Sequence, residues 1–491
     1  MTNSKNTKRA LTYSTLALLM CVAMLIGTTF AWFTDTASTG VNKIVSGNLK
    51  VDIIGADSDS HIEKLNFTKK AATTDAEAGA EILWEPGCRY LTEGFRIANK
   101  GNLALKWKAQ VNTGTTTANE GNFDLLDVID FYLVTKAADG TETETALDEF
   151  TGNLKKTETS DVYYIKGVMQ TTAGNDYQGL TLDGIGITVV ATQATYEKDS
   201  IDDQYDKDAE YPILVTTGDE LQAIVSNATA PVNIVLTNSI TTNNFVIPAD
   251  KDVTLDLNGR TVTNAESHTI LNKGHLTLTD SSADKSGQII SLKGNTAALR
   301  NGDNAVCVVE GGTISRDGAN GNTWHVVENF GKMTFNGGKV VLKNGNGFAI
   351  TNGWNYFDPG ASTTHAVMEI NALELDTDSS GIKNCRYGDL TVNDVTVTST
   401  GYWALSNDYL GTAVINGGTL TSNSFKAVSN GAAMTVNGGT FDGTEGFVVQ
   451  SYATSTVLNG GTFANMNVAA LSSYVGTGHT AQQSGTSVII K

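Results

Sequence analysis

Proline, cysteine and basic residues are all scarce in this chain. Its 491 residues include 5 prolines and 4 cysteines, whereas glycine occurs 50 times, which favours strands and tight turns over long helices. Cys88, Cys307 and Cys385 are too scattered to form the disulfide framework of a small exported domain. The net charge of −19 disfavours nucleic-acid partners and fits either simple solubility or binding of divalent cations.

Short hydrolase motifs are also missing. The six histidines form no HExxH pattern, and no two of them stand four residues apart, so we expect no metal site of the zinc-protease kind. No Gly-x-Ser-x-Gly elbow provides a serine nucleophile. We therefore expect no cofactor, with calcium left as an open possibility.

One short unit recurs through the C-terminal half of the chain. It reads apolar-Asn-Gly-Gly-Thr-apolar, as at residues 436–441. Near-copies begin at Val309, Phe335, Ile415 and Leu458, and degenerate copies begin at Ile370 and Val392. From residue 394 onward the unit returns every 21 to 23 residues. A fixed period of this size predicts a solenoid, and the double glycine predicts a turn that needs positive φ.

A second marker, an asparagine two positions after an apolar residue, repeats out of phase with the first. It occurs at Asn272, Asn301, Asn329, Asn352, Asn384, Asn407 and Asn430, and Ser451 and Ser473 take its place in the last two coils. The two-residue spacing puts the asparagine on the inward face of a strand. Stacked rungs lie about 4.8 Å apart, so each amide can donate to the next and accept from the previous one. We predict an internal asparagine ladder in a parallel β-helix of about nine coils, most simply right-handed.

The first 31 residues have the composition of an export signal. Lys5, Lys8 and Arg9 precede an apolar core at residues 16–27, and a small-residue site ends at Ala31. We expect cleavage between Ala31 and Trp32, with an uncleaved membrane anchor as the alternative. Membrane contact is then confined to the leader, and the mature protein is expected to be extracellular.

Three ordered motifs after this leader carry a family resemblance. They are Trp-Phe-Thr-Asp at residues 32–35, Trp-Glu-Pro-Gly at 84–87 followed by the segment 95–105, and the strand-like segment 185–195 with its Ala-Thr-Gln. Together they resemble the TasA/camelysin family of exported matrix proteins. The resemblance implies a jelly-roll-like β-sandwich over residues 32–206 and a place in secreted fibres, a biofilm matrix or the cell surface. It also implies self-assembly or co-assembly with TasA-like subunits. Camelysin-like metalloprotease activity has poor support without HExxH.

The remaining chain divides into a connector and the solenoid. Residues 207–230 are expected to form a linker and a short helix at 219–227 that caps the first coil. Residues 231–491 are expected to form the parallel β-helix, which resembles pectate-lyase-like solenoids. The fold class is therefore all-β.

Two sets of side chains are candidates for function. Arg386, Asp389 and Asp408 follow ladder positions in adjacent coils and are the best site for a carbohydrate-active enzyme, a polysaccharide lyase or hydrolase. Several aromatic residues fall close to the ladder positions, and these are Trp354, Tyr387, Trp403, Tyr409 and Tyr452. Exposed aromatics can stack on polysaccharide or host glycans or pack against a partner protein, although they can also fill gaps beneath loops. The sequence favours a structural or adhesive protein with the β-helix as a binding arm.

Overall fold

A computed structural model describes most of the chain after residue 47. The described ranges are 48–62, 65–68, 82–112, 115–116, 123–137, 139–147, 150–183, 186–194, 210–319, 323–354 and 364–491. The expected signal peptide, its cleavage site at Ala31 and Trp32, and the acidic stretch 195–209 lie outside these ranges. In the described part, no helix is long and apolar enough to cross a bilayer.

The N-terminal part contains antiparallel sheets. The larger one joins β1 (Val51–Gly55), β4 (Phe95–Asn99), β10 (Tyr163–Met169), β3 (Arg89–Thr92), β2 (Phe67–Thr68), β7 (Ile129–Lys136) and β8 (Glu142–Ala146). A second joins β12 (Gly186–Gln193), β5 (Leu105–Asn112) and β9 (Phe150–Leu154), and a small pair joins β6 (Thr115–Thr116) and β11 (Leu182–Asp183). Two short 3-10 helices, η1 (Leu125–Asp127) and η2 (Asn175–Tyr177), lie in the connections.

Aromatic side chains fill the space between these sheets. Phe95, Trp107 and Ile165 are buried in one core, and the rings of Trp107 and Phe150 meet edge to face at 5.6 Å. Gly152 is required beside the indole, because a Cβ at this position would lie 2.6 Å from a Trp107 ring carbon. The sheets therefore pack face to face through large rings.

Buried Asn99 holds the turn inside the segment 95–105. Its Nδ2 donates to the carbonyl oxygens of Leu103 at 2.7 Å and Lys155 at 3.1 Å, and its Oδ1 accepts the N–H of Gly101 at 2.9 Å. These bonds give partners to backbone groups of the turn and of the neighbouring segment. The asparagine of this motif therefore has a direct structural role.

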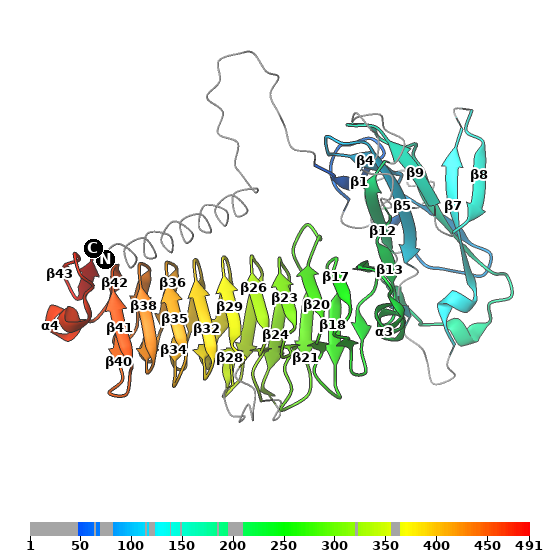
Figure 1. Cartoon of the computed structure of the whole chain (residues 1–491). Coiled ribbons are helices and arrows are strands. Elements are labelled where there is room, and N and C mark those ends of the chain that lie inside the picture. Colours follow the sequence, from blue (N-terminus) through cyan, green and yellow to red (C-terminus); the bar gives the residue numbers. More distant parts are fainter. Residues whose placement is uncertain are drawn as a thin grey trace, which may run out of the picture. The chain divides into compact units, whose positions relative to one another are not determined.

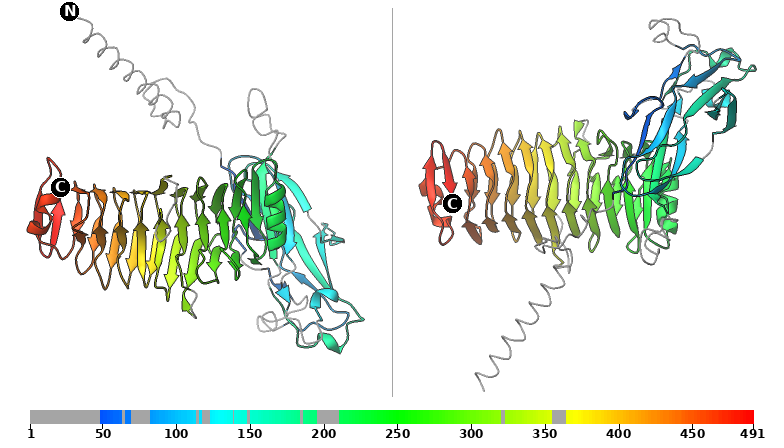
Figure 2. Two further views of the ribbon diagram at one scale, coloured as in Figure 1. Left: turned by 60° about the horizontal axis from the view of Figure 1, so that its bottom comes forward. Right: turned by 90° about the horizontal axis from the view of Figure 1, so that it is seen from above.

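The C-terminal part is a parallel β-solenoid of about ten turns, in agreement with the predicted β-helix (Figures 1 and 2). Its first sheet stacks β13 (Ile213–Val215), β14 (Val232–Leu236), β17 (Asp252–Asp256), β20 (His275–Thr279), β23 (Val306–Val309), β26 (Lys332–Phe335), β29 (Ala366–Ile370), β32 (Gly388–Val392), β35 (Thr412–Ile415), β38 (Ala433–Val436) and β41 (Ser455–Leu458). We call it the first sheet below.

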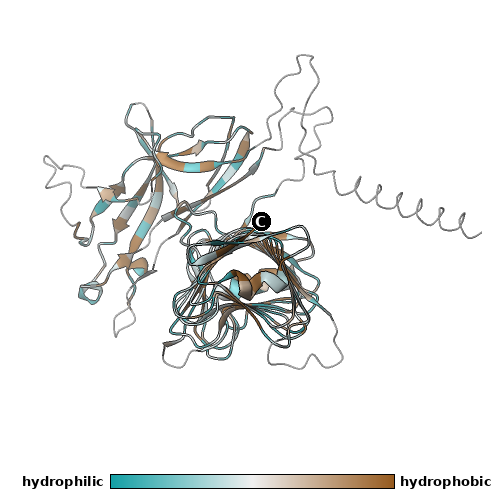
Figure 3. Ribbon diagram, turned by 90° about the vertical axis from the view of Figure 1, so that its left-hand side faces the viewer, coloured by the Kyte–Doolittle hydropathy of each residue, from teal (hydrophilic) through white to brown (hydrophobic). Residues whose placement is uncertain are grey.

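The other two sheets follow in the same order along each coil. The second sheet stacks β15 (Ile240–Thr241), β18 (Thr261–Asn264), β21 (Gln288–Ser291), β24 (Thr313–Asp317), β27 (Lys339–Lys343), β30 (Glu374–Thr377), β33 (Thr396–Ser399), β36 (Thr419–Ser422), β39 (Thr440–Asp442) and β42 (Gly461–Phe463). The third sheet stacks β16 (Val246–Ile247), β19 (Ile270–Asn272), β22 (Leu299–Asn301), β25 (Val327–Asn329), β28 (Phe348–Asn352), β31 (Ser380–Asn384), β34 (Leu405–Asn407), β37 (Val428–Asn430) and β40 (Phe447–Val449). Figure 3 looks along the coils and shows them superposed around one interior.

The double glycines make the turn between the first and second sheets. In each of these units the second glycine has positive φ, from +85° at Gly312 to +114° at Gly461. Only glycine takes this conformation without a steric penalty. The prediction for the Gly-Gly unit is therefore confirmed.

Both ends of the solenoid interior are closed. At the first coil, helix α3 (Gly218–Asn227) packs Leu221 and Val225 into the core, which confirms the predicted helix at 219–227. Strand β13 lies inside the stretch predicted as a linker and pairs in parallel with β14. At the last coil, β44 (Ser487–Ile490) pairs antiparallel with both β42 and β43 (Ala481–Ser484), and α4 (Val468–Leu471) and η4 (Ser472–Tyr474) lie beside them.

Candidate functional site

The predicted asparagine ladder is present in the interior. Each Nδ2 donates to the Oδ1 of the next asparagine at 2.8 or 2.9 Å, in the order Asn272, Asn301, Asn329, Asn352, Asn384, Asn407 and Asn430. All seven side chains are buried. Every amide also bonds to backbone carbonyls, as Asn407 does to Ala433 at 2.8 Å. The ladder therefore satisfies buried polar groups and fixes the register of the coils.

The extension of this ladder to Ser451 and Ser473 is wrong. Val449 occupies the rung after Asn430, and the Nδ2 of Asn430 donates instead to Thr456 Oγ1 at 2.8 Å. Ser473 lies in η4, outside the stacked strands. The connection before β40 is two residues shorter than the one before β37, so Val449 and not Ser451 pairs with Asn430.

A second asparagine ladder, which we did not predict, runs along the outside of the Gly-Gly turns. Here each later asparagine donates to the earlier one at 2.7 to 2.9 Å, in the order Asn459, Asn437, Asn416, Asn393, Asn371 and Asn336. Asn336 then donates to Glu310 Oε1 at 2.8 Å. The two ladders donate in opposite directions along the solenoid. The asparagine of the repeated unit was visible in the sequence, but its stacking was not.

The two acids of the candidate enzyme site, Asp389 and Asp408, each have a basic partner. Asp389 faces outward on β32 and accepts from His365 Nδ1 at 2.9 Å, whereas Asp408 pairs with Lys383 at 3.2 Å. Arg386 lies with its guanidinium 5.1 Å from the ring of Tyr387. Each acid thus has its own basic partner on the preceding coil. His365 is the residue that sequence reasoning missed, because its contact to Asp389 spans 24 residues.

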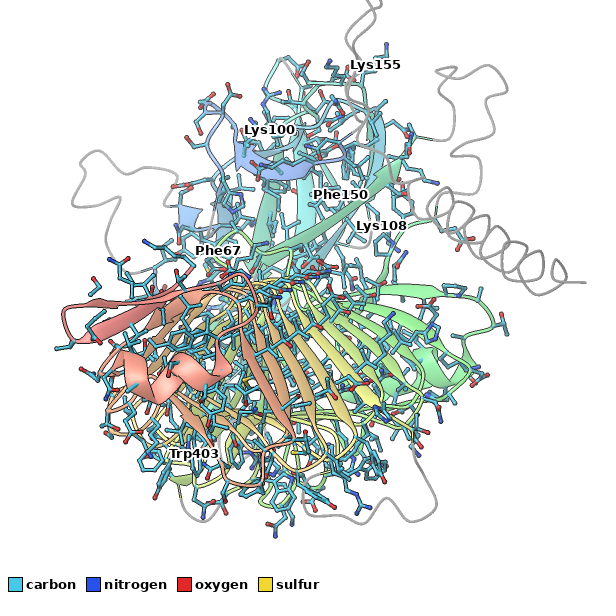
Figure 4. All side chains as sticks on the ribbon, turned by 60° about the vertical axis from the view of Figure 1, so that its left-hand side comes forward. Phe67, Lys100, Lys108, Phe150, Lys155 and Trp403 are labelled. Carbon is cyan, nitrogen blue, oxygen red and sulfur yellow. The ribbon has the colours of Figure 1, made fainter. Side chains whose placement is uncertain are left out.

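Trp354 and Trp403 are packing residues. The ring of Trp354 lies tilted against that of Phe330 on the preceding coil, with the ring centroids 4.7 Å apart. Trp403 lies edge to face with Phe425 at 5.1 Å, and Figure 4 shows it at the periphery of the solenoid. Their indole Nε1 atoms are buried. Both side chains are half-buried, and a ring of a neighbouring coil packs against each of them.

Tyr409 and Tyr452 are exposed, at 62% and 58%, and Leu410 beside them is exposed at 41%. They lie on the corner between the third and first sheets. Tyr387 is half-buried on the same corner, 5.6 Å from the ring of His365. We call Arg386, Tyr387, Tyr409, Leu410 and Tyr452 the corner patch.

A second polar cluster, also unpredicted, lies on the third sheet. Glu328 accepts from Arg300 at 3.2 Å and from the indole of Trp324 at 2.9 Å, and Phe330 stacks on the guanidinium of Arg300 at 4.7 Å. Burial raises the pKa of Glu328, while Arg300 and the indole hydrogen bond oppose the rise. The carboxyl group is only 1% exposed, so this pair joins two coils and does not face a ligand.

Among the described residues, no three His, Cys, Asp or Glu side chains gather as metal ligands. Comparisons of the chain with family models, with characterised proteins and with solved structures find no match.

Proposed function

We propose that this protein is a secreted or cell-surface structural and adhesive protein of an extracellular matrix or surface fibre, with the β-helix as its binding arm. The observation that carries the proposal is the corner patch, where two exposed tyrosines lie on a rigid stack of coils. Exposed rings held on a regular scaffold are typical of a recognition surface. The resemblance to TasA and camelysin adds the extracellular matrix setting.

The closed ends of the solenoid support its role as an arm. An open β-helix end would offer unpaired strand edges to another molecule. Here Leu221 closes one end of the core, and Leu471 and Val488 close the other. We therefore assign assembly to the N-terminal region, where residues 32–51 include apolar Trp32, Phe33, Val41 and Ile44 that can pair with a neighbouring sheet edge.

The test is a truncation of the mature chain. Deleting residues 32–46 should leave a folded monomer that no longer polymerises or co-assembles with TasA-like subunits, as measured by sedimentation and electron microscopy. Such a heterologous contact need not close, so it can extend into fibres. The double variant Tyr409→Ala, Tyr452→Ala serves as the control, and it should assemble normally. Full assembly by the truncated chain would contradict the assembly half of the proposal.

A carbohydrate-active enzyme is the second candidate function. The observation in its favour is that His365, Asp389 and Tyr387 lie together on the corner, because imidazole and phenol groups can transfer protons. The test is cleavage of polygalacturonate by the protein. If the protein cleaves it and the variants His365→Ala and Asp389→Ala do not, the enzyme function is favoured over the adhesive one. Metalloprotease activity is implied by the family resemblance alone.

A further inference from the structure

We propose that the corner patch binds a neutral, linear glycan that lies along the solenoid axis. This inference rests on the proposed function, because it names the ligand class of the binding arm. Its test uses glycan binding alone, so its failure is distinguishable from a failure of assembly.

Strand register places Arg386 and Tyr387 on one coil, Tyr409 and Leu410 on the next, and Tyr452 two coils beyond that. The backbone N–H of Asp408 donates to Asn384 O at 2.8 Å, and the N–H of Gly431 donates to Asn407 O at 2.7 Å. Tyr387 and Leu410 occupy the same place in their turns, each with φ of +59°. Arg386 and Tyr409 directly precede them, so they too are neighbours along the axis, about 4.8 Å apart.

Gly431 leaves room for the Tyr452 ring on the same corner as Tyr387 and Tyr409. The intervening coil has a short turn at Gly431, and the Tyr452 ring folds back over it. A Cβ added at Gly431 would lie 2.5 Å from Cε2 of Tyr452. The Tyr452 ring therefore lies over the turn of the coil between them, and the two exposed rings follow each other along the solenoid axis.

Polar groups are held beside these rings. Asp408 is oriented by Lys383 at 3.2 Å and by the N–H of Tyr409 at 2.8 Å, and Asp389 is oriented by His365 at 2.9 Å. A pyranose ring has apolar C–H faces and a rim of hydroxyl groups. Stacking on the tyrosines with hydroxyl donation to these carboxylates suits both parts of such a ligand.

The size of the patch and the net charge of the whole chain favour a neutral glycan. The exposed apolar part is limited to two tyrosines and Leu410 on one corner, which is small for the continuous core of a stable protein interface. The net charge of −19 repels polyanions, and acidic polysaccharides are therefore disfavoured. A linear neutral glycan can bind by stacking on a short row of aromatic rings.

Isothermal titration calorimetry of the full mature chain tests the proposal, with hexaoses of β-glucan, xylan and mannan as probes and polygalacturonate as the acidic comparator. At least one neutral hexaose should bind, and Tyr409→Ala or Tyr452→Ala should weaken it about tenfold. Tyr402→Ala is the matched control, because Tyr402 is 54% exposed on a different corner. It should bind like the unmodified chain.

Gly431→Ala provides a sharper variant, because it keeps both tyrosines. The added methyl group must displace the Tyr452 ring, which is a movable side chain, so folding should survive while binding falls. Unchanged affinity in the tyrosine double variant would overturn the proposal. Absence of binding to every neutral hexaose, or binding to polygalacturonate alone, would overturn it as well.

Discussion

Asn384 donates a hydrogen bond from Nδ2 to Oδ1 of Asn407 at 2.8 Å, inside a solenoid where both side chains are almost wholly buried. The same amide also donates to the carbonyl oxygens of Gly388 and Thr412. One side chain thus joins its own turn to the next coil. Removing a single member of such a row takes one buried hydrogen bond away from the asparagine on each side.

Asn407→Leu should therefore lower the free energy of unfolding by about 1 to 3 kcal/mol. It removes the acceptor of Asn384 and the donor to Asn430 in a buried turn. Asn416→Leu is the matched control, because Asn416 makes the same side-chain bonds in the exposed ladder and should cost within about 0.5 kcal/mol. Equal denaturant midpoints for the two variants would show that burial of the ladder is not what matters.

Adjacent glycines in one Gly-Gly turn should respond differently to alanine. Gly312 has φ of +85°, and a Cβ there would also lie 2.8 Å from Leu257 Cδ1, so Gly312→Ala should cost about 1 to 2 kcal/mol. A Cβ at Gly311 would meet only Asp280 N, at 3.6 Å. Gly311→Ala should be nearly neutral by thermal unfolding, and a similar loss at both positions would contradict this reading of the turn.

Stability should fall as the pH drops from about 6.5 toward 4. Burial lowers the pKa of His268 and of His325 to about 4, with nearby basic residues adding to the effect. Each ring accepts a backbone N–H from the next coil, His268 from Ala297 at 2.8 Å and His325 from Phe348 at 3.1 Å. Because these pKa values are lower in the folded state, the unfolded chain takes up the protons first.

Thermal unfolding between pH 7.5 and 4 measures this dependence. His325→Gln should reduce its slope, since one of the two imidazoles with a lowered pKa is gone. His275→Gln is the control, because His275 faces solvent on β20 and its removal should leave the slope unchanged. A wild-type slope in His325→Gln would assign the acid sensitivity to other groups.

Export should remove the first 31 residues. The small-residue site that ends at Ala31 and the Trp-Phe-Thr-Asp start at residues 32–35 motivate this expectation. N-terminal sequencing of exported protein should begin at Trp32. A mature form that retains residues 16–27 would show that the segment is an anchor.

The sequence by itself determined the solenoid, its internal ladder and its capping helix. These features depend on local rules that repeat, namely an inward asparagine two positions after an apolar residue and a glycine where φ is positive. Each further copy of the repeat also supports the predicted register, because each coil must pair with the next in the same way. The helix at α3 followed from the placement of Leu221 and Val225 on one face.

Only the tertiary structure decided which side chains stay exposed and which find partners. That Trp354 packs against Phe330, and that Asp389 faces His365 and not Asp408, depends on how neighbouring coils stack. The outer ladder depends on the same stacking, although its asparagines stand in the repeated unit. Tyr452 reaches over Gly431 because the turn at Gly431 is short and the turn on the next coil is long. The repeat period of the sequence does not show that difference.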